Sequence, residues 1–144
     1  MSETSIIFRK WEFTKDNQTY ELGRPTLSVE RDYATYMEGI SSQVLDRSRQ
    51  ALGPIGYPEA MKIHLQNCVN NHYGWGRQGF LESLANPIHV ARFLYCWFRK
   101  FYPDNTPLHI KKEDMYILYT SNHMEKLKTM VEECIQDPNP LAPE

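Results

Sequence analysis

The sequence has few cysteines and no long apolar run. Its 144 residues include three cysteines, an odd and widely spaced set, which favours a reducing compartment over a secreted disulfide framework. The first apolar run, residues 6–8, is too short for the core of a signal peptide. No segment approaches the roughly 20 apolar residues that span a bilayer. These absences predict a cytoplasmic protein without a membrane segment.

An excess of charge of either sign is also absent. The 16 Lys and Arg residues nearly balance the 18 Asp and Glu residues, for a formal net charge of -2, and both signs are scattered along the chain. A domain that binds nucleic acid or an anionic membrane needs a basic face. We therefore expect neither as a partner.

Motifs for catalysis or phosphate binding are missing as well. Three glycines occur in residues 74–79, but they follow a predicted helix rather than a strand. The stretch also lacks a P-loop lysine followed by Ser or Thr. We interpret it as a tight turn between helices with Trp75 tucked inward, and we expect no enzyme activity and no cofactor.

Aromatic residues, in contrast, make up 12% of the chain, and apolar side chains follow clear periods. Alternation on both sides of polar residues 15–18 predicts a β-hairpin over residues 11–22. Apolar spacings of three and four predict long helices over 29–52, 58–72, 87–101 and 122–135, with short helices over 77–84 and 115–119. The helix after Pro58 should carry these side chains into the core: Met61, Leu65, Cys68, Val69 and His72.

These elements predict a mostly α fold, in which an N-terminal β-hairpin packs on a bundle of five to six helices. We expect a single domain over residues 1–136. The three prolines in residues 137–144 predict an extended, mobile tail.

The helix over residues 87–101 is the most apolar segment. Asn86 is a suitable N-cap and Pro87 suits the first helical position. Ten of residues 88–101 are apolar, so this helix should lie at the centre of the core.

Phe93 and Trp97 lie one turn apart at the rim of the polar stripe of this helix, beside Arg92 and Lys100. Aromatic residues next to basic ones are typical of an interface hot spot. This composition predicts a partner-binding site made of these four residues. The alternative is that the hairpin covers the aromatic pair, through Trp11 and Tyr20.

His64, Cys68 and His72 are spaced four apart, which could stack three soft-metal ligands on one helical face. One straight helix cannot close a tetrahedron with all three, so a site would need Cys134 or His123 as well. The other interpretation places these residues in or beside the core. We favour that one and expect no metal.

Cys96 lies between Arg92, Arg99 and Lys100, and positive charge favours the thiolate that a nucleophile requires. A nucleophile also needs an oriented base, and the nearest histidine on this helix, His89, is two turns away. A structural cysteine is the favoured interpretation.

The order of elements resembles that of small phage tail assembly chaperones, which hold a tape-measure protein before the tail tube forms around it. Three stretches carry the resemblance: the hairpin 11–22 leading through 25–27 into a helix, the apolar helix 93–104 ending in a basic pair and a proline, and the acidic helix start 110–115 followed by the last helix. It implies a non-enzymatic protein of the host cytoplasm, of phage origin, whose helical surface binds helical segments of a long client. Homo-oligomerisation stays open.

On this hypothesis Phe93 and Trp97 anchor the client, and Trp97→Ala should weaken client binding by about 2 kcal/mol or more without unfolding the protein. A second hypothesis is a small phage-encoded inhibitor or immunity-type protein that blocks a partner enzyme. A third is an enzyme built on Cys96 or on the face of His64, Cys68 and His72.

Overall fold

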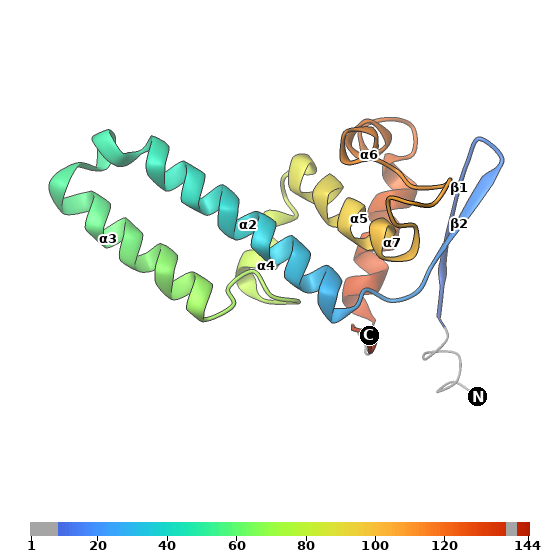
Figure 1. Cartoon of the computed structure of the whole chain (residues 1–144), viewed down its shortest axis with the longest axis horizontal. Coiled ribbons are helices and arrows are strands. Elements are labelled where there is room, and N and C mark those ends of the chain that lie inside the picture. The colour runs from blue at the N-terminus through green and yellow to red at the C-terminus, as the bar shows by residue number, and fades with distance from the viewer. Residues whose placement is uncertain (1–8, 138–140) are drawn as a thin grey trace.

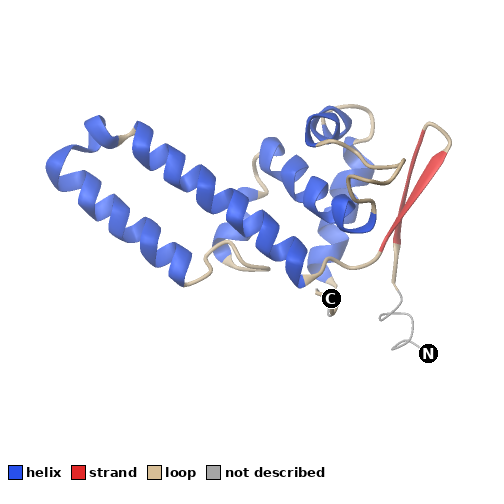
Figure 2. Ribbon diagram, viewed as in Figure 1, coloured by secondary structure: helices blue, strands red, loops and turns tan. Residues whose placement is uncertain are grey.

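The structure, a computed structural model, describes residues 9–137 and 141–144 and consists of a β-hairpin packed on helices (Figures 1 and 2). The elements in chain order are β1 (Trp11–Lys15), β2 (Gln18–Leu22), α2 (Leu27–Arg47), α3 (Arg49–Val69), α4 (Gln78–Ser83), α5 (Pro87–Phe101), α6 (Lys112–Tyr119) and α7 (Met124–Gln136). The predicted fold class is confirmed. None of the helices in the described part of the chain combines the length and apolar character of a membrane span.

The hairpin forms where the sequence predicts it. β1 and β2 pair antiparallel, with Trp11 opposite Leu22. Asp16 and Asn17 form the turn, and both have positive φ values, of 51° and 64°. Positive φ at both turn residues matches the twist of the two strands, and Asp and Asn tolerate it better than most residues. Alternate side chains of the hairpin are buried: Trp11, Phe13, Tyr20 and Leu22.

α5 lies at the centre of the core. The Asn86 side chain accepts a hydrogen bond from the Ile88 N–H at 2.9 Å, and Pro87 occupies the first turn, as the sequence predicts. α5 packs against α2, α6 and β2. Its buried residues are Val90, Ala91, Phe93, Leu94, Cys96, Trp97 and Phe98.

α2 and α3 form an antiparallel pair that projects from the rest of the molecule (Figure 1). The predicted long helix ends earlier than expected, at Arg47, and α3 contains a kink at Gly53, where φ is 74° and ψ is -175°. We refer to α2 and α3 together as the arm.

The prediction that the second helix enters the core is wrong. None of the α3 residues is buried, and Leu65 and Val69 are 55% and 85% exposed. The helix that α3 packs against is α2, and one helix covers only one side of another. His72 lies beyond the end of α3, in the turn that follows it.

The predicted tail meets the start of α2. Ala142 pairs with Thr26 in a parallel bridge, and its N–H donates to the Pro25 carbonyl at 2.8 Å. Residues 141–144 are thus attached to the domain, and the predicted mobility of this part of the tail is wrong because backbone and side-chain hydrogen bonds hold it to the start of α2. Residues 138–140 lie outside the described residues.

Glu144 holds this attachment. Its carboxylate accepts a hydrogen bond from the Ser28 N–H at 3.4 Å and from Lys100 Nζ at 3.2 Å. Hydrogen bonds from Thr26 and Ser28 lower the pKa of Glu144 to about 2. Thr26 is the N-cap of α2 but makes no capping bond with its own side chain, so the Glu144 carboxylate satisfies an N–H at this helix start.

Candidate functional site

Trp97, one of the two predicted anchors, is fully buried. The indole of Trp11 packs edge-on against it, with 5.4 Å between ring centroids. Trp97 Nε1 donates a hydrogen bond to the Gly23 carbonyl at 2.8 Å. The hairpin and the segment after it therefore cover Trp97, which is the alternative that the sequence left open.

Phe93, the other predicted anchor, is fully buried too. Its cover comes from the opposite side of the core, from α2, α4 and the turn before α4. The enclosing rings, at centroid distances of 5.6 to 5.8 Å, are those of Tyr33, Phe80 and Trp75. The predicted surface position of Phe93 and Trp97 is wrong, because a partner could touch them only by opening the core.

Arg92 and Lys100 stay near the surface but do not form one site. Lys100 is engaged by Glu144 at 3.2 Å. The Arg92 guanidinium lies over the ring of Tyr36 at 4.6 Å and near the ring of Tyr95 at 5.5 Å. The two basic residues thus belong to different surroundings.

Cys96 is buried, and its burial raises the pKa of the thiol to about 11, although nearby Arg92 and Arg99 act in the opposite direction. The thiol is therefore protonated at neutral pH, and a protonated thiol is a poor nucleophile. His89 Nδ1 is engaged with the Tyr36 hydroxyl at 3.0 Å. The position of Cys96 fits the structural interpretation.

Of the three spaced ligand candidates, His64 and Cys68 lie together, but His72 lies apart from them. His64 Nε2 lies 3.8 Å from Cys68 Sγ, and His64 Nδ1 lies 2.9 Å from the Ser41 hydroxyl. His72 stands in the turn after α3, with its ring against Tyr73 at 5.0 Å. Over residues 9–137 and 141–144, no group of three or more His, Cys, Asp or Glu side chains could hold a metal ion.

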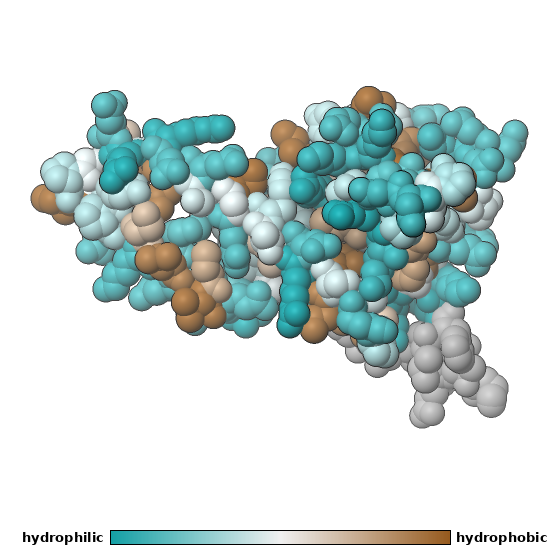
Figure 3. Space-filling model, in the orientation of Figure 1, coloured by the Kyte–Doolittle hydropathy of each residue, from teal (hydrophilic) through white to brown (hydrophobic). Residues whose placement is uncertain are grey.

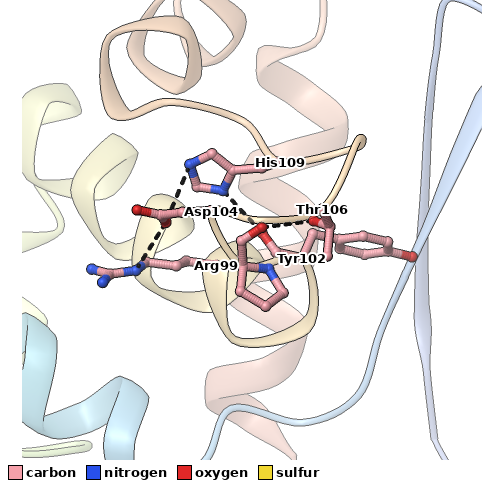
Figure 4. Close-up of polar contacts among 6 residues, drawn as sticks. Arg99, Tyr102, Asp104, Thr106 and His109 are labelled. Carbon is pink, nitrogen blue, oxygen red and sulfur yellow. Dashed lines mark hydrogen bonds and ion pairs between the residues drawn. The ribbon is translucent and has the colours of Figure 1, made fainter.

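A cluster of polar side chains lies at the loop between α5 and α6 (Figure 4). His109 Nδ1–H donates to the Tyr102 carbonyl at 2.9 Å. Asp104 lies 3.5 Å from both His109 Nε2 and Arg99 Nε. Thr106 adds a hydrogen bond to the Pro103 carbonyl at 2.7 Å. These bonds are local, so the cluster fixes the path of the loop.

The surface that sequence reasoning missed is on α3. Pro58, Met61, Leu65 and Val69 line a shallow hollow of about 490 Å³ along one flank of this helix. Spacings of three and four place these residues on one face, which we call the α3 stripe. Figure 3 shows apolar side chains gathered over the second half of α3.

A signal of this exposure was present in the sequence. Ile55, Ile63 and Leu65 point in different directions around α3, since each residue turns the helix by about 100°. Such a distribution does not specify a single buried side. The prediction of burial was based on the regular spacing from Met61 to His72 and did not take these other apolar residues into account.

Comparison with known proteins assigns no family to the chain. No family model, no curated protein and no solved structure matches it. A functional hypothesis must therefore start from the surface that the fold presents.

Proposed function

We propose that this protein is a non-enzymatic protein-binding domain that acts in phage tail assembly, as a chaperone or a small tail-associated protein. Its client-binding surface is the α3 stripe, in place of Phe93 and Trp97. The observation that carries the proposal is the exposure of apolar side chains along α3, with Leu65 at 55% and Val69 at 85%.

The α3 stripe suits an amphipathic client helix. Helix-in-groove recognition uses apolar anchors at spacings of three, four and seven residues, and the α3 stripe repeats at these spacings. Burial of apolar surface contributes roughly 25 cal/mol per Å². Lys62 and Gln66 border the hollow and provide a polar edge. A long, largely helical tape-measure protein would offer many such segments.

The projection of the arm supports the same proposal. α3 packs on α2, and the arm extends away from the body built around α5 (Figure 1). A client helix could therefore lie along α3 without displacing a core element. The hairpin and α5, which carry the resemblance to tail assembly chaperones, act as the scaffold of the arm.

The test is co-expression with the product of the longest neighbouring reading frame, followed by size-exclusion chromatography. The proposal expects the client to stay soluble and to co-elute. Leu65→Gln should weaken the complex by about 1–2 kcal/mol, as expected for an interface anchor. The matched control is Ile63→Gln, because Ile63 has nearly the same exposure, 57% against 55%, but lies on the other flank of α3.

Two results would contradict the proposal. Equal effects of the two substitutions on the complex would show that the α3 stripe is not the specific client-binding surface. If the chain elutes alone as a monomer while its neighbour precipitates, the inhibitor hypothesis takes first place.

A further inference from the structure

A second hollow, of about 310 Å³, lies where α2, α5 and α6 meet. Arg92 of α5 and Lys112 of α6 contribute positive charge to its lining, and Glu113 contributes one negative charge. Ile88 and Tyr116 add apolar surface. This hollow is distinct from the α3 stripe, and its interpretation does not depend on the proposed function.

The Arg92 guanidinium is held in place before any ligand arrives. It lies over the Tyr36 ring at 4.6 Å and near the Tyr95 ring at 5.5 Å. The Tyr36 hydroxyl is in turn engaged with His89 Nδ1 at 3.0 Å. A guanidinium stacked on aromatic rings loses less freedom when it binds a ligand than a mobile side chain does.

This guanidinium lacks a polar partner for one of its donors. Arg92 Nε is buried and has no hydrogen-bond partner. None of the ion pairs within the described residues includes Arg92 or Lys112. Neither basic side chain is therefore neutralised by an ion pair, and an anion in the hollow would pair with the charge of both.

The charge of the lining indicates which anion fits. Arg92 and Lys112 give two positive charges and Glu113 one negative charge, a net charge of +1. That balance suits a carboxylate, which carries one negative charge, better than a phosphate group with a charge nearer two. The planar fork of arginine also matches the two oxygens of a carboxylate.

We propose that this hollow binds a carboxylate attached to an apolar or aromatic group. The carboxylate pairs with Arg92 and Lys112, and the apolar portion lies against Ile88 and Tyr116. The carboxylate can belong to a free organic acid or to an Asp or Glu side chain of a protein partner, and the test separates these two sources.

The test is a titration of the full chain followed by ¹H–¹⁵N NMR, which observes the Arg92 Nε–H signal directly. Phenylacetate should shift this signal in a saturable way. Phenylacetamide, which has the same shape without the charge, should bind at least tenfold more weakly, and inorganic phosphate should bind more weakly than phenylacetate. The peptide acetyl-Leu-Glu-Leu-amide represents a protein-borne carboxylate. Tighter binding of the peptide assigns the ligand to a protein partner, and tighter binding of phenylacetate assigns it to a free acid.

Two variants locate the site, each with backbone amide signals as the readout. Arg92→Gln should abolish the saturable shifts. Lys112→Gln, on a different helix, should weaken binding severalfold and covers the case in which Arg92→Gln does not fold. The control is Arg99→Gln, two turns along the same face of α5, because Arg99 is already paired with Asp104 at 3.5 Å.

The proposal is overturned if phenylacetamide binds as tightly as phenylacetate, or if phosphate binds more tightly. It is also overturned if folded Arg92→Gln retains the shifts, or if no probe gives a saturable shift at tens of millimolar.

Discussion

Neighbouring side chains on one helix of this protein differ sharply in their exposure to solvent. In α5, Arg92 reaches the surface while Phe93 is fully buried. Helical phase sets the angle of each residue around the axis, and the sequence predicts those angles well. The side chains that pack against each face of the helix come from distant parts of the chain, as Trp11 does for Trp97. The sequence therefore predicted which residues share a face of α5, but it did not decide whether Phe93 and Trp97, at the rim of the polar stripe, are covered.

Trp97→Ala should destabilise the protein, contrary to the expectation for an exposed anchor. The substitution removes a fully buried indole and leaves a cavity, which costs about 3–5 kcal/mol in the free energy of unfolding. It also removes the hydrogen bond to the Gly23 carbonyl. Urea denaturation measures the change.

The control for this measurement is Tyr116→Ala. Tyr116 is 42% exposed, and a surface substitution of this kind should change the free energy of unfolding by about 0.5 kcal/mol or less. An unfolding free energy of the Trp97 variant equal to that of the unaltered protein would show that the indole is not in the core.

At the scale of elements, local chemistry decides where helices and strands begin and end. The Asp16–Asn17 turn and the Asn86–Pro87 start of α5 follow from the sequence because short-range sterics and hydrogen bonds determine them. The exposure of α3, in contrast, did not follow from its local sequence. An apolar pattern shows that a face needs cover, but it cannot show whether that cover belongs to the same chain.

Gly53 and Gly39 offer a matched test of the break in the arm. At both positions an added Cβ would meet nothing within 4 Å, so only the backbone conformation distinguishes them. Gly53 combines a φ of 74° with a ψ of -175°, a region essentially restricted to glycine. Gly53→Ala should lower the free energy of unfolding by about 1–3 kcal/mol. Gly39, inside α2, is helical, and Gly39→Ala should raise it by about 0.5–1 kcal/mol.

Thermal unfolding of both variants by circular dichroism checks the signs. Shifts of the melting temperature in the same direction would mean that the kink at Gly53 does not require its left-handed backbone conformation.

At the scale of the whole molecule, α3 differs from the other long helices in how much apolar surface it buries. α5 contributes seven buried residues, whereas α3 contributes none. Regions with little buried apolar surface open at a lower free energy than the global transition. α3 is therefore the less stable part of the arm, whereas α2 has five buried residues and packs on α5. The proposed client, by covering the α3 stripe, would stabilise α3.

Native-state hydrogen exchange should resolve this difference. Amides in the middle of α3 should exchange through openings that cost several kcal/mol less than those of α5 amides, which should follow global unfolding. Equal protection of the two helices in the isolated protein would contradict the prediction. Addition of the client should raise the protection of α3 more than that of α5.

The attachment of Glu144 to the start of α2 also affects the order in which contacts can form during translation. The hydrogen bond between Ser28 and Glu144 joins residues 116 positions apart, so at 5 to 20 residues per second the ribosome adds Glu144 roughly 6 to 23 seconds after Ser28. Helix pairing within the arm needs only the first 69 residues of the chain. During translation α2 and α3 are therefore complete in sequence well before the carboxylate that satisfies an N–H at the start of α2 has been added.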